Sequence, residues 1–458
     1  MKNRLSSLIC IICLLLTLSL LLSSCVLGEP VGIAEAKIND EGELIIVYTD
    51  GTEQNLGLVV GRDGENGKDG ENGTDGKDGA DGKDGENGTN GSTTIVSDGS
   101  SIPTASAKGL RSAVSIVCKF KATVQQGGWY PGSSNTTTKE YSSAGSGVIY
   151  RLDKATGDAF IITNYHVVYD ASSNTANGIS DDISVYLYGA EYTEKAIKAE
   201  YVGGSLYYDI AVLRIEDSEL LKASSAAAVS IADSDAVVVG DSAIAIGNAQ
   251  GYGISASYGI VSVDSEYITM TAADGKTAVS FRVIRVDTAV NSGNSGGGLY
   301  NEDGNLLGIV NAKIVDDGVE NIGYAIPSSV AVSIAENIID YCFGTDVERV
   351  QRALLGITVS TTDSKAVYSE KTGLVTIEET IAVHEVTNGA LADGVLLADD
   401  VLVSATLNGV TKRITRQYHI IDMMLDVRVG DTVTLTVLRD GAEIALNIVI
   451  TADCLSAY

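Results

Sequence analysis

Short runs of apolar and β-branched residues, separated by glycine-rich or polar turns, fill most of the chain between residues 108 and 345. Such runs, with turn residues at both ends, predict β-strands. They form two groups with no long helical pattern between them, so we expect two antiparallel β-barrels with a cleft between them. The expected strands cover residues 113–120, 145–150, 159–162, 183–188, 199–201 and 210–215, and then residues 243–246, 259–263, 281–286, 298–299, 306–313 and 324–326.

The pattern changes after Pro327. Val330, Ile334 and Ile338 recur at helical spacing, and Gly344 can end the helix that they predict. Residues 350–458 then combine short strands with one helical stretch at residues 420–425, which predicts a separate α+β domain. The expected fold class is therefore mainly β.

The first 24 residues predict export from the cytoplasm. Lys2 and Arg4 precede an apolar run at residues 8–22, which is the pattern of a signal peptide. The run ends in Leu-Ser-Ser-Cys, which resembles a bacterial lipobox, and Cys25 would then carry the lipid that holds an extracytoplasmic protein to the cell membrane. An uncleaved membrane anchor is the alternative.

Three further segments precede the barrels. Residues 25–60 predict a small β module to which we assign no chemistry. Residues 61–91 have glycine at every third position, the repeat of a collagen triple helix, but contain no proline to stiffen it. A trimeric stalk and a flexible polar spacer both remain open. Residues 92–107 read as a linker.

Composition excludes some functions. The chain has 458 residues, which suggests several domains, and its 60 acidic against 31 basic residues give a net charge of −29. Such a surface repels nucleic acid, so we expect no nucleic-acid partner. After Cys25, only Cys118, Cys342 and Cys454 remain, and we expect them to be free thiols, the usual buried state of unpaired cysteines. No spacing predicts a metal site.

The candidate nucleophile is Ser295, within Gly-Asn-Ser-Gly-Gly at residues 293–297. A serine that attacks a carbonyl needs an uncrowded turn with backbone N–H groups near the developing oxyanion. The same five residues fit the Gly-x-Ser-x-Gly elbow of α/β-hydrolases, and a plain glycine-rich turn is a further alternative.

Chain order separates these alternatives. An α/β-hydrolase needs a histidine after its serine, but His384 and His419 lie in the separate tail without a suitable acid. His166 ends an apolar run before the serine, and Asp209 begins another run between them. His, Asp and Ser in this order are the arrangement of trypsin-like proteases.

Five segments, at residues 163–168, 209–213, 247–248, 291–297 and 323–327, together resemble the HtrA (Deg) family of trypsin-like serine proteases. The resemblance implies a trypsin-like protease domain at residues 108–345 and a PDZ-like domain at residues 350–458. It also implies that His166 is the general base, that Asp209 orients it, and that Ser295 forms the acyl-enzyme. The N–H groups of Gly293 and Ser295 would form the oxyanion hole.

The family also implies partners and an activity. Substrates would be unfolded or misfolded exported proteins, cut without ATP or a cofactor by a homotrimer, and residues 125–143 would be a long regulatory loop. Ile309, Val310 and Asn311 would pair with substrate as an edge strand. Leu355, Gly356 and Ile357 would hold C-terminal peptides in the PDZ-like domain.

Two positions bear on specificity and control. Ala289 stands six residues before the serine, where enzymes that cut after Lys or Arg carry an acid, so we expect a small or apolar residue at P1. Asn294 replaces the aspartate that pairs with a freed N-terminus in zymogens, so activation by cleavage is not expected. The alternative function is a non-catalytic surface protein that binds peptides or acts as a chaperone on a collagen-like stalk.

Overall fold

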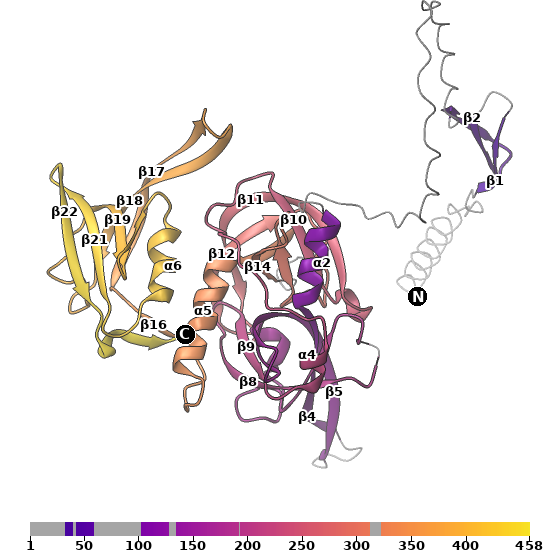
Figure 1. Cartoon of the computed structure of the whole chain (residues 1–458), viewed down its shortest axis with the longest axis horizontal. Coiled ribbons are helices and arrows are strands. Elements are labelled where there is room, and N and C mark those ends of the chain that lie inside the picture. Colours follow the sequence, from indigo (N-terminus) through magenta and orange to yellow (C-terminus); the bar gives the residue numbers. More distant parts are fainter. Residues whose placement is uncertain (1–32, 40–42, 59–101, 128–133, 192, 312–321) are drawn as a thin grey trace, which may run out of the picture. The chain divides into compact units, whose positions relative to one another are not determined.

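The computed structural model describes residues 33–39, 43–58, 102–127, 134–191, 193–311 and 322–458, which form two separate units, residues 1–91 and 92–458. The signal peptide, Cys25 and the repeat at residues 61–91 lie outside the described residues. In the first unit, β2 pairs antiparallel with strands on both sides (Figure 1). Its strands are β1 (Ile33–Ile38), β2 (Glu43–Tyr48) and β3 (Glu53–Leu58).

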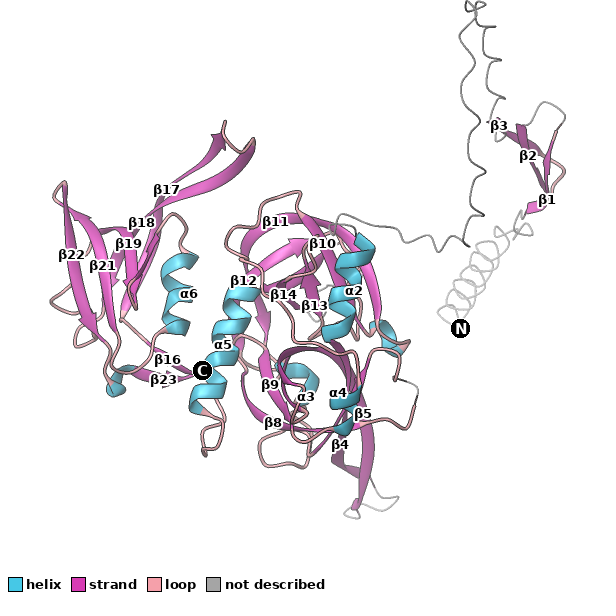
Figure 2. Ribbon diagram, in the orientation of Figure 1, coloured by secondary structure: helices cyan, strands magenta, loops and turns pink. Residues whose placement is uncertain are grey.

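Two closed six-stranded barrels make up the first part of the second unit and confirm the predicted fold class (Figure 2). All of their strand pairs are antiparallel. The first barrel comprises β4 (Ala113–Gly127), β5 (Ser134–Asp153), β6 (Asp158–Thr163), β7 (Asp182–Leu187), β8 (Ile197–Ser205) and β9 (Ile210–Ile215). The second comprises β10 (Ser242–Gly247), β11 (Ser255–Thr271), β12 (Ala278–Val286), β13 (Gly298–Tyr300), β14 (Leu306–Val310) and β15 (Gly323–Pro327).

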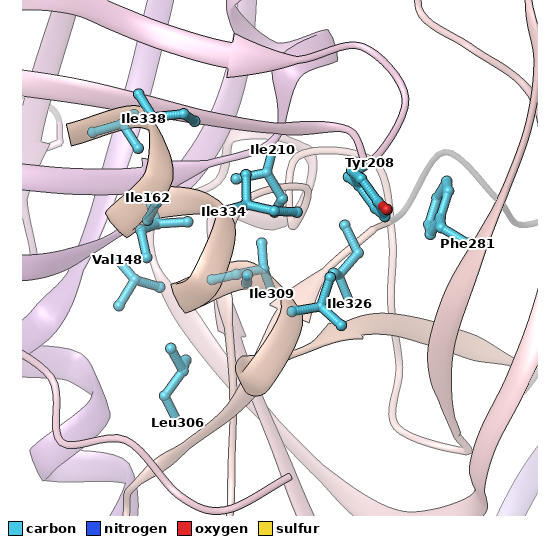
Figure 3. Close-up of a cluster of buried hydrophobic side chains, with 14 of the residues drawn as sticks. Val148, Ile162, Tyr208, Ile210, Phe281, Leu306, Ile309, Ile326, Ile334 and Ile338 are labelled. Carbon is cyan, nitrogen blue, oxygen red and sulfur yellow. The ribbon is translucent and has the colours of Figure 1, made fainter. Parts of the chain in front are cut away.

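One hydrophobic cluster joins the two barrels to helix α5 (Ser328–Tyr341), which starts directly after Pro327 as its pattern predicts (Figure 3). Ile162 of the first barrel, Ile309 of the second and Ile334 of α5 are all fully buried in it. Burial of such side chains contributes roughly 2 kcal/mol each. The cluster also contains Tyr208 and Ile210, the two neighbours of Asp209, so the position of this acid depends on the junction between the barrels.

The predicted linker at residues 92–107 is wrong at its end, because helix α2 (Ile102–Ser112) begins there. Its Gly109 lies against Ile246 and Tyr300 of the second barrel, closely enough that a Cβ would come within 2.5 Å of Ile246 Cδ1. Ser112 Oγ and Tyr300 Oη are 3.0 Å apart and share a hydrogen bond. Packing against the barrel therefore stabilises a helix whose small and polar residues resemble those of a linker.

The predicted loop at residues 125–143 is also corrected. β4 and β5 continue their antiparallel ladder beyond the barrel, and Gln125 still pairs with Thr136. The segment is rich in threonine, which suits an exposed strand as well as a loop. A paired hairpin therefore extends from the first barrel at this point.

The C-terminal domain is a mixed α+β domain, as its pattern predicts. A five-stranded antiparallel sheet in the order β17-β18-β19-β21-β22 carries the short strand β20 beside β19, and helix α6 packs with the sheet in one hydrophobic core. The elements are β16 (Gln351–Ala353), β17 (Ile357–Ser369), β18 (Leu374–Val386), β19 (Val401–Leu407), β20 (Val410–Arg413), α6 (Tyr418–Asp426), β21 (Thr432–Arg439), β22 (Ala442–Val449) and β23 (Leu455–Ala457).

A buried arginine joins the second barrel to the C-terminal domain. Arg282 of β12 is 3 % exposed, and its guanidinium lies 2.8 Å from Asp235 and 3.2 Å from Asp422 of α6. The ring of Tyr418 covers it, with 3.8 Å between Cζ and the ring centroid. Burial raises the pKa of Asp422 to about 6, although the charge of Arg282 opposes the shift. In this cluster, burial therefore destabilises the ionised form of Asp422 more than the charge of Arg282 stabilises it.

This raised pKa predicts a pH-dependent stability. Folded Asp422 keeps its proton up to about pH 6, whereas the unfolded chain loses this proton near pH 4. The contribution of Asp422 to stability therefore falls as pH rises from about 4 to about 6, by at most about 3 kcal/mol. We expect Asp422→Asn to lose this dependence, measured as urea midpoints at about pH 4.5 and about pH 7. Asp340→Asn is the control, because Asp340 pairs with Arg428 in an exposed position. Equal pH profiles for parent and Asp422→Asn would contradict the prediction.

Candidate active site

His166 is held by two hydrogen bonds to one carboxylate. The apolar strand β6 is followed after one residue by the short helix α3 (Tyr165–Val168), and His166 is the second residue of this helix. The backbone N–H of His166 donates to Asp209 Oδ1 at 2.9 Å, and its ring Nδ1 lies 2.7 Å from Asp209 Oδ2. An Nδ1–H that donates to a carboxylate leaves Nε2 as the basic nitrogen.

Asp209 adopts a backbone conformation that few residues other than glycine accept, with φ of 55°. Its carbonyl accepts hydrogen bonds from Tyr165 N–H at 3.1 Å and Asn164 Nδ2 at 2.8 Å. Its Oδ2 accepts a second hydrogen bond, from Asn311 Nδ2 at 2.8 Å. These contacts fix the carboxylate at a position where it is 5 % exposed.

The loop that carries Ser295 requires glycine on both sides. Gly293 and Gly296 have φ of 95° and 82°, and a Cβ at either position would approach a backbone oxygen to within 2.3 Å. The first barrel fixes this second-barrel loop, since Ser146 Oγ donates to Gly293 O at 2.7 Å and Ser146 N–H to Ser295 O at 2.8 Å. The two barrels therefore jointly position the serine.

His166 and Ser295 line one cavity of about 540 Å³. Its other lining residues come from the segments at residues 169–172 and 273–275 and from Ser292. No hydrogen bond joins Ser295 Oγ to His166 in the structure as described. The site thus brings the three predicted catalytic residues to one place, with His166 and Asp209 already paired.

The peptide bond before Gly293 has a defined orientation. Ser292 O accepts a hydrogen bond from Gln250 N–H at 2.6 Å. Because a trans peptide directs its C=O and N–H oppositely, the N–H of Gly293 points away from Gln250. Neither this N–H nor that of Ser295 donates to another described residue.

The predicted edge strand at Ile309, Val310 and Asn311 is wrong. Ile309 and Val310 belong to β14, which pairs with β13 on one side and β15 on the other, so their backbone groups are used within the barrel. Asn311 N–H donates to Tyr324 O, and its side chain reaches Asp209. Closure of the barrel removes the free edge that an isolated apolar run suggests.

Leu355, Gly356 and Ile357 line a second cavity, of about 230 Å³, in the C-terminal domain. Ile420 and Met424 of α6 form its other side. Gly356 has φ of 74°, the left-handed conformation that favours glycine. The structure thus places these three residues together at the start of β17, far in sequence from the helix that faces them.

Sequence reasoning missed two residues of the site and gave a third a different role. Ser146 and Asn164 are the two that the sequence does not single out. Only Asn164 carries a local signal, since it is a polar residue two positions before His166. Asn311 was assigned to substrate rather than to Asp209. Each acts through a contact with a residue distant in sequence, for which no local pattern exists.

The described residues include three free cysteines, of which Cys454 is only partly buried, unlike the expectation for it. Cys118 and Cys342 are buried free thiols, as predicted, and burial raises the pKa of each to about 12. Within the described ranges, no three His, Cys, Asp or Glu side chains are grouped so as to hold a metal ion. The same ranges contain no helix that is long and apolar enough to cross a membrane.

Comparison with known proteins gives matches that cover most of the chain. A family model described as "Trypsin-like peptidase domain" matches residues 145–309. Serine protease Do-like HtrA of Lactococcus lactis subsp. cremoris is 32 % identical over 379 residues, covering 78 % of this chain and 84 % of the relative. The protein of the same name from Bacillus subtilis is 35 % identical over 327 residues, covering 69 % of this chain and 65 % of the relative.

Among solved structures, the HtrA-type protease AlgW with a decapeptide is 25 % identical, with a TM-score of 0.47. The match covers 77 % of this chain and 98 % of that one. Periplasmic serine endoprotease DegP of Escherichia coli is 30 % identical over 319 residues, which cover 69 % of this chain and 59 % of DegP.

Proposed function

The chain belongs to the HtrA family of trypsin-like serine endopeptidases, and on this premise we propose that it cleaves unfolded or misfolded exported proteins through a triad of His166, Asp209 and Ser295. The observation that carries the proposal is the pairing of His166 with Asp209 at 2.7 Å in the cavity that Ser295 also lines. A histidine with a structural role alone would not require both a buried carboxylate at Nδ1 and a serine in the same cavity.

The mechanism follows from these positions. Ser295 Oγ attacks the scissile carbonyl while His166 Nε2 takes its proton, and the proton then passes to the leaving amine as the peptide C–N bond breaks. Water, activated by the same nitrogen, hydrolyses the acyl-enzyme and restores the serine. Asp209 keeps the proton on Nδ1 and stabilises the imidazolium that forms at each step. No cofactor or ATP enters this sequence.

The oxyanion would bind to the N–H groups of Gly293 and Ser295. Two observations support this assignment: neither N–H donates to another described residue, and the hydrogen bond from Gln250 N–H to Ser292 O fixes the peptide that carries the Gly293 N–H. Donors that are fixed before the reaction need no reorganisation when charge develops, and loss of one such donor typically lowers kcat about a hundredfold or more.

The rest of the proposal concerns location and partners. The sequence pattern suggests that Cys25 is a lipid anchor and that the repeat at residues 61–91 is a stalk or a spacer. The homotrimer is proposed from the family. An extracytoplasmic site of action is in keeping with the relative named periplasmic DegP. In the PDZ-like domain, the cavity between β17 and α6 would hold C-terminal peptides at Leu355, Gly356 and Ile357.

The test is degradation of a permanently unfolded protein by residues 92–458 without ATP, beside a folded form of the same protein. We expect only the unfolded form to be cut, after small or apolar residues, because Ala289 offers no acid for a basic P1 side chain. N-terminal sequencing of the products measures the preference. Binding of the unfolded protein without any cleavage would favour the non-catalytic peptide-binding alternative.

A further inference from the structure

β17 offers a long unpaired edge beside the second cavity. It is the first strand in the order β17-β18-β19-β21-β22, so one side pairs with β18 and the other pairs with no described strand. The cavity lined by Ile357 and Val359 lies at the beginning of this strand. From there the strand continues to Ser369, 13 residues in all. An open edge of this kind is a template for another extended chain.

Beyond Thr361 the strand leaves the domain core as an arm, defined here as the paired segments 363–369 and 374–380 (Figure 1). A register shift between Thr361 and Asp363 marks its start. A ribbon of only two strands is marginally stable in water and gains from a third strand. No part of the arm belongs to the hydrophobic core of the C-terminal domain.

The arm has one distinctly apolar face. Ala366 pairs with Ile377, and Tyr368 pairs with Val375, so the four side chains share a face because successive residues alternate. Tyr368 is 62 % exposed and Val375 57 % exposed. If a further strand paired with the free edge of β17, every second side chain of that strand would lie on this face. Apolar side chains there would pack beside those of Ala366 and Tyr368.

At the other end of β17, where the strand begins, Arg352 and Leu355 both line the second cavity. Its Nε is buried without a hydrogen-bond partner, and Nη2 reaches only Ile421 O, at 3.5 Å. The charge of Arg352 also acts on Asp422, whose pKa it lowers against the larger effect of burial. A guanidinium with donors to spare at one end of a strand edge is suited to a carboxylate.

We propose that the C-terminal domain binds about the last ten residues of an unfolded polypeptide in extended form along the whole of β17. The C-terminal carboxylate lies at Arg352 and Gly356, and the upstream residues run antiparallel to β17 and reach the apolar face of the arm. A ligand with apolar residues at alternate upstream positions fits this edge. The inference rests on the proposed peptide groove and extends it to a longer substrate segment.

The test compares two peptides with the same C-terminal residues, one of about four and one of about twelve residues with alternating valines upstream. Binding is measured by fluorescence anisotropy on the full chain carrying Ser295→Ala, which keeps the peptides intact. We expect the longer peptide to bind about tenfold more tightly, and amidation of its C-terminus to weaken it.

Variants of the arm distinguish peptide binding along the arm from peptide binding in the groove alone. Tyr368→Lys with Val375→Lys should remove the advantage of the longer peptide and leave the shorter one unchanged. Thr376→Lys is the matched control, because Thr376 pairs with Val367 on the other face of the arm. Equal affinities for both peptides in the parent would overturn the inference but keep the groove. Binding of neither peptide would overturn both, whereas protease activity tests the triad independently.

Discussion

Ser295→Ala is expected to lower kcat for cleavage of an unfolded protein by roughly a millionfold, to the level left by binding and the oxyanion hole alone. The reason is the loss of the proposed nucleophilic oxygen, which belongs to a residue that lines a cavity with His166. Its loop also carries the N–H groups of Gly293 and Ser295, which donate to no described residue. Alanine removes only Oγ, while the hydrogen bond from Ser146 N–H to the carbonyl of residue 295 stays. The loop should therefore keep its shape.

The measurement is the release of labelled fragments from a permanently unfolded protein, with labelling by a fluorophosphonate as a second readout. Ser172→Ala is the control, since Ser172 lines the same cavity but its side chain bonds Asp170. It should cleave at a rate close to that of the parent. A parent that is labelled at Ser295 but cleaves nothing would indicate a latent protease, and cleavage that survives Ser295→Ala would refute the assignment of the nucleophile.

The barrels could be predicted, and the three proposed catalytic residues selected, because their signals are local. Each barrel strand is a short apolar run between turns, and runs such as Ile210–Ile215 are almost wholly buried. His166, Asp209 and Ser295 stand at the ends of such runs or in a glycine turn, in an order that few folds share. The pattern therefore indicates both the fold and the position of the cleft.

The strand pattern at residues 374–377 is confirmed as part of β18, but the rest of the arm, the β4–β5 hairpin and α2 could not be predicted, for a common reason. Their residues are mostly polar, small or exposed, and their stability comes from pairing or packing with segments that local pattern does not identify. Residues 361–369 include few apolar side chains, yet they pair with β18 on both sides of one register shift. Gly109 weakens the helical pattern of α2, although its missing side chain is what lets the helix approach Tyr300.

The edge-strand error has a different cause. An apolar run that precedes a predicted substrate contact looks the same whether it closes a barrel or borders a cleft. Only the pairing of β14 with both β13 and β15 distinguishes them. The same closure brings Asn311 to Asp209 across 102 positions of sequence.

That contact makes Asp209→Asn the second large expected effect, a loss of about 10⁴-fold in kcat. The carboxylate accepts three donors: His166 N–H at Oδ1, and both His166 Nδ1–H and Asn311 Nδ2 at Oδ2. An asparagine that accepts from His166 N–H must turn its own NH₂ toward the other two. The imidazole then binds it through an unprotonated Nδ1, so that Nε2 carries the proton and cannot serve as the base.

The comparison is made with kcat and KM for a peptide substrate. KM should change little because Asp209 is buried and does not line the cavity. Asp170→Asn is the control, because the Asp170 carboxylate lines the cavity beside His166 but accepts its hydrogen bond from Ser172 and not from His166. Asn311→Ala should fall between them, because it removes one donor but leaves the tautomer intact. Near-parental kcat in a folded Asp209→Asn protein would mean that another group orients His166, and the triad would then have to be reassigned.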